Sequence, residues 1–409
     1  PMLFRLRGFL TLLTLLLLAS CATPPAPPPK VPVVIESDGV FPSPPELQPQ
    51  VAFWRNVYAV WGRHQVALHD NRHMGLIYEV VTLPGEVREG YTAEQQALVK
   101  GRYESLKAAL RQLEFKTAAN APLTPEEQAL ATRLQQYGSG AFAGASDRLR
   151  SQRGLRERFK RGLEISGRYD AAFRSIFREA GLPEDLAYLP HVESSFQTHA
   201  TSSVGAVGVW QFMPGTARQF MTLNAAMDER RDPVASAQGA SRYLGSAYGR
   251  LGNWPMALTS YNHGVGGMVR AQKQFGDDFA AIVRSYSGPG FGFASRNFYA
   301  EFLAASQIAR NPQQFFPEGL AYEPPLNLDR VRLRQAVAAP TLANYYEVSL
   351  WELNRINPAW NPPAQTGRLA LSGGTQVWLP AGTIARMAQR GMAGGSIALA
   401  DPVSTAQPR

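Results

Sequence analysis

Apolar residues recur at helical spacing in the segment 51–168. One stripe begins at Phe53 and Trp54 and ends at Trp61, a second extends from Tyr103 to Leu113, and a third covers 129–137. A period near 3.6 residues is typical of helices that bury one face. We interpret the stripes as core faces and predict an N-terminal helical region over 51–168.

The segment 169–320 shows clearer starts and stops. Phe173 and Phe177 share a helical face that ends at Gly181, and Asp232-Pro233 combines an acidic N-cap with proline at the first helical position. Gly252 ends that second helix. Because strand-like alternation is scarce, we predict a compact, mostly helical domain over 169–320.

The pattern changes after residue 320. Val331–Leu333 and Gln376–Pro380 alternate like strands and flank two short helical segments, with Asn357-Pro358 after the second. This order predicts a small α+β module over 321–384, and the weak pattern beyond it predicts a disordered tail over 385–409. The fold class expected for the whole chain is mainly α.

The N-terminal segment has the features of an export signal. Arg5 and Arg7 precede the apolar run Gly8–Leu18, whose length of about 11 residues is too short to cross a bilayer. The run ends just before Cys21, the single cysteine of the chain, which excludes an internal disulfide. The residues before Cys21 resemble a bacterial lipobox, so we expect a signal peptide over 1–20 and lipidation of Cys21. The alternative is an ordinary export signal with an accidental cysteine.

The segment 21–50 is rich in proline and poor in periodic apolar residues, which is typical of an extended spacer. Ala22 follows the cysteine where an aspartate would change lipoprotein sorting. We therefore expect a lipid-anchored protein on the outer membrane, facing the periplasm, with a tether over 21–50.

Charge narrows the class of partner without selecting one. The chain of 409 residues has a formal net charge of +9, which favours anionic partners such as lipid headgroups, nucleic acid or the acidic cell-wall polymer. No basic stripe interleaved with aromatic residues is present, so nucleic acid is the weaker expectation.

Glu193 is the strongest catalytic candidate. It ends a largely apolar segment that includes Leu189 and Val192. Apolar surroundings raise the pKa of a carboxyl, which then stays protonated near neutral pH as a general acid requires. Nearby, Gly205 and Gly208 lack side chains where a large substrate would approach the backbone. Taken alone, Glu193 would be an ordinary surface glutamate.

Several separated motifs place Glu193 in a recognisable context. They are Glu193-Ser194, Ser202, Gly205-Ala206-x-Gly208-x-x-Gln211, Asp228-x-Arg230-x-Asp232-Pro233 and Tyr261-Asn262-x-Gly264. Over about residues 170–310 the chain resembles the lytic transglycosylase domain of the goose-lysozyme-like fold. The resemblance implies Glu193 as the single catalytic acid and base. The substrate-binding residues expected with it are Ser202, Gly208, Gln211, Met213, Tyr261, Asn262 and Tyr299.

Two regions depart from the family's pattern. Phe298 occupies a position where the family has tyrosine and cannot hydrogen-bond, which leaves open whether the next residue, Tyr299, takes that role. The tail 321–384 resembles a LysM glycan-binding module, although Ala339-Pro340-Thr341 replaces the usual entry to its first helix. The alternative for the tail is a structural cap. In its overall order of segments the chain looks most like the membrane-bound lytic transglycosylase D group.

The acids near Glu193 bear on the mechanism. Most glycosidases use two carboxylates, but the next acid after Glu193 is Asp228, and Asp228 and Asp232 look like loop and cap residues. A single acid fits an intramolecular route that closes a 1,6-anhydro ring and needs no cofactor. A hydrolytic muramidase and a catalytically silent peptidoglycan-binding lipoprotein are the alternatives. We expect a monomer whose partner is the glycan strand.

His69 and His73 have the spacing of zinc ligands on one helix face. Asp70 follows His69 where the zinc-protease motif needs glutamate, and no third ligand stands out. The sequence therefore predicts no metal site.

Overall fold

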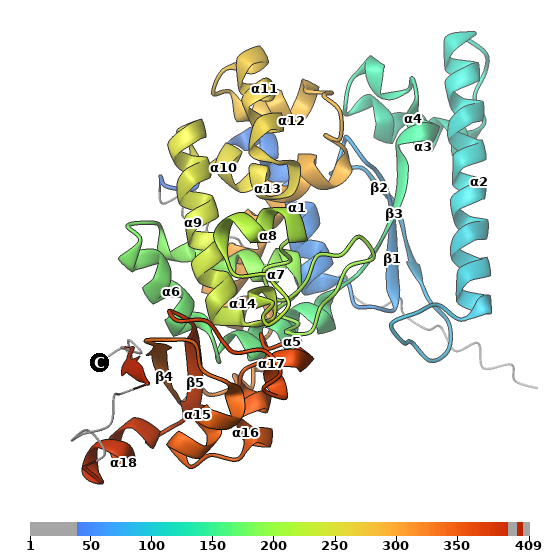
Figure 1. Ribbon diagram of the computed structural model, residues 1–409. Coiled ribbons are helices and arrows are strands. Elements are labelled where there is room, and N and C mark those ends of the chain that lie inside the picture. The colour runs from blue at the N-terminus through green and yellow to red at the C-terminus, as the bar shows by residue number, and fades with distance from the viewer. Residues whose placement is uncertain (1–38, 392–398, 404–409) are drawn as a thin grey trace, which may run out of the picture. The chain divides into compact units, whose positions relative to one another are not determined.

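The computed structural model describes residues 39–391 and 399–403 (Figure 1). The predicted signal peptide, Cys21 and the proline run before residue 39 lie outside these residues. Within the described ranges, no helix is both long and apolar enough to cross a membrane.

The packed structure begins earlier than the predicted tether allows. Phe41 and Leu47 are buried, a 3₁₀ turn spans Pro45–Leu47 (η1), and the first helix is α1 (Gln48–Arg55), which continues into the π-helical turn η2 (Asn56–Val60). The prediction of a spacer up to residue 50 is therefore wrong for its last part. Proline at the first positions of η1 and α1 starts helices here instead of preventing them.

A three-stranded antiparallel sheet interrupts the N-terminal region, where only helices were predicted. It consists of β1 (Gln65–Asp70), β2 (Ile77–Thr82) and β3 (Leu149–Arg153) in the order β2-β1-β3. Val66 and Leu68 of β1 face one core cluster and Ala67 faces another. Because both faces of β1 are buried, its sequence lacks the apolar–polar alternation that identifies a half-exposed strand.

Helices α2 (Ala93–Ala118) and α3 (Pro125–Gln135) accompany this sheet, followed by η3 (Ser139–Ala141) and α4 (Ala145–Arg148). Thr92 and Thr124 close capping boxes at the starts of α2 and α3. Leu110 and Leu113 of the predicted stripe are buried with Leu68 of the sheet, and Figure 1 shows α2 alongside β1–β3.

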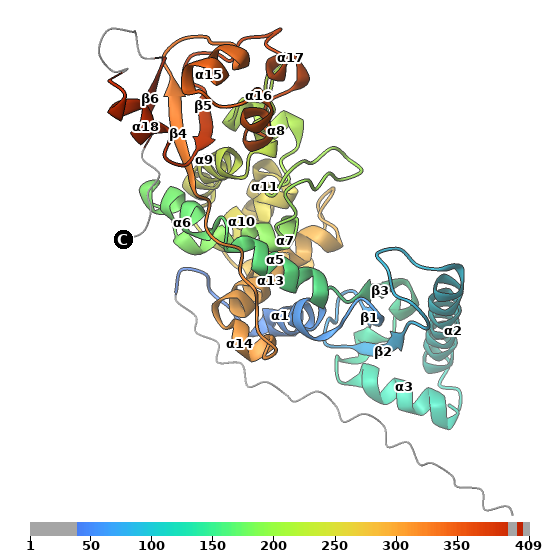
Figure 2. The same cartoon turned by 90° about the horizontal axis from the view of Figure 1, so that it is seen from below.

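The segment 156–315 is helical, as predicted. Its elements are α5 (Arg156–Ser166), α6 (Asp170–Glu179), η4 (Glu184–Tyr188), α7 (Leu189–Glu193), α8 (Pro214–Phe220), η5 (Glu229–Arg231), α9 (Pro233–Leu251), α10 (Trp254–His263), α11 (Val265–Phe275), α12 (Phe279–Ser285), α13 (Phe293–Arg310) and α14 (Pro312–Phe315). The expected boundaries of α9 are confirmed, because Asp232 caps its first turn and Gly252 ends it at φ +80°. Helix α13 packs against α1, α7 and α10, and both views show α1 beside it (Figure 2).

The C-terminal module has the predicted strand–helix–helix–strand order. Strands β4 (Leu328–Leu333) and β5 (Gln376–Pro380) pair antiparallel and enclose α15 (Ala339–Tyr346), α16 (Leu350–Ile356) and the short α17 (Pro362–Gln365). Asn357 supports the second strand, since its side-chain amide donates to the Trp378 carbonyl at 2.9 Å and accepts from the Trp378 amide at 2.8 Å.

The predicted disordered tail contains ordered elements. Helix α18 spans Thr383–Gln389, and β6 (Ala400–Pro402) adds to the sheet in the order β5-β4-β6. Met387 and Ala400 are buried against the module core. Segments this short carry too little periodicity to be recognised in sequence, and the open edge of β4 determines where β6 forms.

Several hydrogen bonds join the module to the helical domain, among them the bond from the Asp228 amide to the Ala359 carbonyl at 2.7 Å, and one of them involves Trp378. The indole Nε1 of Trp378 donates to Asp232 Oδ2 at 2.8 Å, while Oδ1 of the same carboxylate accepts from the backbone amides of Val234 and Ala235. Trp378 and Asp232 are both buried. The Asp232 carboxylate therefore both caps α9 and bonds to the module.

We predict that Trp378→Phe lowers the free energy of unfolding by about 1–3 kcal/mol, because Asp232 Oδ2 loses its buried partner. Chemical denaturation of the two proteins measures the difference. Trp351→Phe is the matched control: Trp351 is 73% exposed, and its replacement should change stability by less than about 0.5 kcal/mol. Equal effects of the two substitutions would show that the junction bond contributes nothing.

Candidate active site

Glu193 is the last residue of α7, and its side chain is half-buried. Burial raises the pKa of this carboxyl to about 8. Glu193 is therefore protonated at neutral pH, as its apolar surroundings in the sequence suggest. A protonated carboxyl in this position has a proton to donate.

The chain turns sharply directly after Glu193. Ser195 and Phe196 adopt left-handed backbone conformations with φ of +50° and +56°. Ser194 Oγ donates to the Val209 carbonyl at 2.8 Å, and the buried Phe196 ring packs on His191 at 4.5 Å. Such strain persists where surrounding contacts over-determine the backbone, and it is frequent at functional sites.

The loop 200–213 lies against this turn and contains Ser202 and Gln211, two of the four expected substrate-binding residues in this loop. Ser202 Oγ accepts from the Ala206 amide at 2.9 Å. Gln211, itself left-handed at φ +51°, donates through Nε2 to the Gly208 carbonyl at 2.7 Å and the Ala200 carbonyl at 3.2 Å. The side chains of Ser202 and Gln211 therefore stabilise the loop through bonds to its own backbone. A sugar that contacts either side chain would meet a polar group that these bonds already hold in place.

Gly205 and Gly208 differ in their surroundings. Both have positive φ, +92° and +82°. A Cβ at Gly208 would lie 1.9 Å from the Arg230 carbonyl oxygen, whereas a Cβ at Gly205 would meet open space. The interpretation that Gly208 makes room for substrate is therefore corrected: the space is occupied by the protein's own backbone.

Arg230 braces the same loop. Its Nε and Nη2 donate to Asp228, and its Nη1 donates to the carbonyls of Gly205 at 3.0 Å and Phe212 at 3.3 Å. The motif Asp228-x-Arg230-x-Asp232 thus consists of a loop acid, a brace and a helix cap. The expectation that Asp228 and Asp232 are loop and cap residues is confirmed.

Tyr261 is brought close to Glu193. Its hydroxyl donates to the Trp210 carbonyl at 2.7 Å, and its ring lies 5.5 Å from that of Phe212. Burial raises the pKa of Tyr261 well above its usual value, and the charge of Glu193 raises it further. The neighbouring Asn262 is exposed and accepts from Ser295 Oγ at 2.7 Å, and Met213 is 41% exposed at the start of α8.

Tyr299, whose role the sequence leaves open, is a core residue. The side chain is fully buried, its hydroxyl donates to the Pro42 carbonyl at 2.7 Å, and its ring packs on Phe279 at 5.3 Å. The hydroxyl of Tyr299 is therefore bonded within the core and not presented at the surface. One step along a helix turns a side chain by about 100°, which takes Tyr299 away from the position of Phe298.

A second carboxyl, that of Glu301 on α13, is not among the site residues expected from the sequence. Tyr58 donates a 3.2 Å hydrogen bond to Glu301 Oε2, and α13 packs against α7. Burial raises the pKa of Glu301 to about 8; the Tyr58 bond lowers it and the charge of Glu193 raises it. The two carboxyls therefore interact, although 108 positions separate 193 from 301.

A signal for Glu301 was present in the sequence. It stands within an apolar stretch of α13, four residues after Asn297, whose Oδ1 accepts from Trp54 Nε1 at 3.3 Å. Polar residues four apart on an otherwise apolar helix share one face and need partners. The partners, Trp54 of α1 and Tyr58 of η2, become apparent only when these elements pack on that face of α13.

The histidine pair does not share a helix face. His69 lies buried in β1 beside Phe53, at a ring distance of 4.3 Å, and His73 lies in the following turn. Across residues 39–391 and 399–403, no group of three or more His, Cys, Asp or Glu residues is placed to hold a metal ion.

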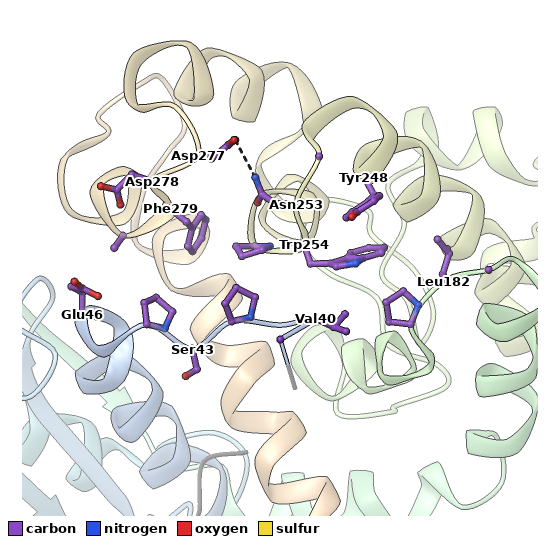
Figure 3. A pocket seen from close by; sticks show the side chains of 18 residues that line it. Val40, Ser43, Glu46, Leu182, Tyr248, Asn253, Trp254, Asp277, Asp278 and Phe279 are labelled. Atoms are coloured by element: carbon purple, nitrogen blue, oxygen red, sulfur yellow. Dashed lines mark hydrogen bonds between the residues drawn. The ribbon is translucent and has the colours of Figure 1, made fainter. Parts of the chain in front are cut away.

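A cavity of about 1020 Å³ lies apart from the predicted site (Figure 3). Its walls come from the segment 39–46 and from the starts of α10 and α12, and Tyr248 stacks on Trp254 there at 4.5 Å. Asn253 donates to Asp277 across one side, at 3.4 Å. None of the expected catalytic or glycan residues lines this cavity.

We predict that Gly208→Ala destabilises the protein more than Gly205→Ala. Positive φ costs each alanine about 1–2 kcal/mol, and only at position 208 does the new Cβ also collide with a backbone carbonyl, which adds about 1–3 kcal/mol. Thermal unfolding of both variants measures the difference. Equal losses would mean that the close approach to Arg230 is not maintained in solution.

Comparison with known proteins finds one family and several relatives. The transglycosylase SLT domain family matches residues 173–281. Membrane-bound lytic murein transglycosylase D of Escherichia coli K12 is 28% identical over 189 residues, which cover 44% of this chain and 40% of that protein. A putative tributyltin chloride resistance protein of Alteromonas is 34% identical over 92 residues, 22% of this chain and 44% of its own. The chain thus spans less than half the length of these relatives.

Two solved structures are also similar. The lytic transglycosylase Slt of Pseudomonas aeruginosa, an inactive mutant, is 22% identical with a TM-score of 0.30, covering 38% of this chain and 25% of its own. The 70 kDa soluble lytic transglycosylase of Escherichia coli is 19% identical with a TM-score of 0.28, covering 54% of this chain and 31% of its own. Residues 173–281 form a transglycosylase SLT domain, in a chain that is distantly similar to membrane-bound lytic murein transglycosylase D.

Proposed function

We propose that this protein cleaves the β-1,4 bond between N-acetylmuramic acid and N-acetylglucosamine in peptidoglycan, with Glu193 as the catalytic acid. The observation that carries the proposal is the half-buried carboxyl of Glu193, protonated at neutral pH, inside an SLT domain. Tyr261 and the loop 200–213 surround it with hydroxyl and amide groups suited to sugars.

The reaction needs one carboxyl used twice. Glu193 donates its proton to the glycosidic oxygen, and the bond from that oxygen to the muramoyl C1 breaks. The Glu193 carboxylate then takes the proton of the muramoyl C6 hydroxyl, whose oxygen bonds to C1. The ring closes as a 1,6-anhydro product, the proton is back on Glu193, and no water is consumed.

Glu301 reopens the hydrolytic alternative, because two carboxyls near one another can act as acid and base. Its environment argues against that role. With a pKa of about 8, Glu301 is protonated at neutral pH and is a poor base for water. As it ionises, its charge repels that of Glu193. We therefore assign Glu301 an electrostatic coupling to Glu193 and not the role of a second base.

The anchor and the tail complete the proposal. A signal peptide and lipidation of Cys21 would hold the enzyme on the outer membrane, facing the periplasm, and the pattern before Cys21 supports this. The strand–helix–helix–strand module at 328–380 supports a LysM-like glycan-binding role. Peptidoglycan strands are the proposed partner, and the mechanism uses no cofactor.

We predict that Glu193→Gln abolishes cleavage, because glutamine has no proton of suitable acidity to donate and cannot accept one from the C6 hydroxyl. Mass spectrometry of muropeptides released from purified sacculi should show products lighter than hydrolytic ones by one water, and none with the variant. Glu184→Gln, in a surface ion pair with Arg178, is the control and should keep wild-type activity.

The product distribution separates the alternatives. Reducing-end products from the wild type would indicate a muramidase. Wild-type protein that binds sacculi and releases nothing would indicate a silent binding protein. The nearly isosteric variant should still fold and bind sacculi, so loss of binding together with activity would contradict a purely catalytic role for Glu193.

We also predict that Glu301→Gln shifts the alkaline limb of the pH–activity profile to lower pH. Glu193 works in its protonated form, so activity falls as pH rises through its pKa. The charge of Glu193 raises the pKa of Glu301, and because this repulsion is mutual, an ionised Glu301 raises the pKa of Glu193 in turn. Removing the charge lets Glu193 ionise earlier, while kcat at low pH and KM stay near wild type. An unchanged profile, or a uniform loss of kcat at every pH, would show that Glu301 does not act on Glu193 through its charge.

A further inference from the structure

The outer face of the C-terminal sheet is polar. In strand β4, charged and apolar residues alternate from Arg330 to Leu333. The side chains of Val331 and Leu333 lie in the module core, so Arg330 and Arg332 lie on the opposite face. In the register of the sheet, Arg330 stands opposite Trp378 and Arg332 opposite Gln376. Because alternate residues share a face, these four residues form one cross-strand surface on the side of the sheet away from the module core, and Trp378 packs there into the core of the helical domain.

This surface faces α6 and α9 of the helical domain (Figures 1 and 2). Two cavities of about 480 and 520 Å³ lie between them. The cavities share walls from both sides, namely Ile176, Glu179 and Gln238 from the helices and Arg330, Arg332 and Gln376 from the strands. We call this pair of cavities the junction groove.

Arg330 is the unusual residue in the junction groove. It is only 6% exposed, its guanidinium stacks over the Trp378 ring at 4.6 Å, and its buried Nε has no hydrogen-bond partner. The nearby Asp232 carboxylate is already committed to the α9 cap and to Trp378. Gln376 Oε1 is likewise buried without a partner. Buried donors and acceptors of this kind are normally satisfied, so both groups point to a ligand.

The charges around the junction groove restrict that ligand. The first cavity is lined by Arg330, Arg332 and Arg242 together with Glu179, Glu229 and Asp232, and Arg168 adds a further positive charge in the second. A polyanion would be attracted by the arginines and repelled by the glutamates, whereas a zwitterionic peptide matches both. Guanidinium groups bind carboxylates in a two-point geometry, and the amides of Gln238 and Gln376 suit peptide groups.

We propose that the junction groove binds the stem peptide of peptidoglycan, with a free carboxylate of the peptide on Arg330 and Arg332. This inference rests on the proposed function, since it takes the peptide from the same polymer. It assigns a role to the contact between the two domains: the catalytic domain receives the sugar strand while the junction groove holds a peptide attached to it. The protein then contacts a glycan strand that carries peptides at two sites, and a peptide-free glycan strand only at the catalytic domain.

The test is calorimetric titration of the stem tetrapeptide L-alanyl-γ-D-glutamyl-diaminopimelyl-D-alanine into the full chain. A charge-assisted bond is worth about 1.5–3 kcal/mol, or roughly ten- to a hundredfold in affinity. Arg330→Lys, which keeps the charge but loses the planar guanidinium, should weaken binding at least about tenfold. Arg332→Gln changes an exposed residue, keeps the fold and should weaken binding severalfold. Arg390→Gln, an exposed arginine paired with Glu347, is the control.

The outcomes separate this inference from the proposed function. The tetrapeptide has no glycosidic bond, so its binding is independent of cleavage, and Arg332→Gln should cleave peptide-free glycan strands at the wild-type rate. Binding that these arginine variants weaken supports the junction groove even if no anhydro product forms. Absence of tetrapeptide binding, or equal affinity in all variants, overturns it. Binding of phosphatidylglycerol vesicles in place of the tetrapeptide, lost in Arg332→Gln, overturns it in favour of a lipid phosphate.

Discussion

The enclosure of the Glu193 carboxyl is the constraint on which the rest of the site depends. Burial disfavours the charged form, so the group keeps its proton at neutral pH, and folding must supply surroundings that tolerate it. Helix α7 is only five residues long and has little stability of its own. The left-handed turn at Ser195 and Phe196, the buried Phe196 ring and the packing of α13 hold it in place. The acid is therefore a property of tertiary packing as much as of residue type.

The short motif around Arg230 connects the site to the remainder of the fold. Arg230 braces the loop that borders Glu193, and the close approach of its carbonyl requires glycine at position 208. Two residues later, Asp232 caps α9 and accepts the indole of Trp378 from the C-terminal module. The loop, the long helix and the module thus share one segment of backbone. A shift of the module would therefore displace Asp232 and, through the motif 228–232, the loop next to the catalytic acid.

The pairing of Glu193 with Glu301 changes the chemistry inferred from sequence. If Glu193 were the only carboxyl in the site, a one-carboxyl mechanism would follow because no second group could act as base. With two interacting carboxyls, the structure must explain why only one of them acts as the acid. The structure supplies a reason, since Glu301 accepts a hydrogen bond from Tyr58 and belongs to the face of α13 that packs on α1 and η2. The N-terminal region, whose purpose the sequence does not indicate, therefore takes part in the electrostatics of the site.

The sequence by itself determined the mainly helical class, the boundaries of α9, the strand–helix–helix–strand order of the tail and Glu193 as the candidate acid, because these depend on local periodicity, capping and motif spacing. Tertiary structure alone decided the features that depend on contacts between distant segments. Strand β1 is buried on both faces and lacks alternation, and the hydroxyl of Tyr299 is hydrogen-bonded to the Pro42 carbonyl. Glu301 reaches Glu193 only when α13 packs on α7. Local spacing records which residues share a face, but not which faces meet.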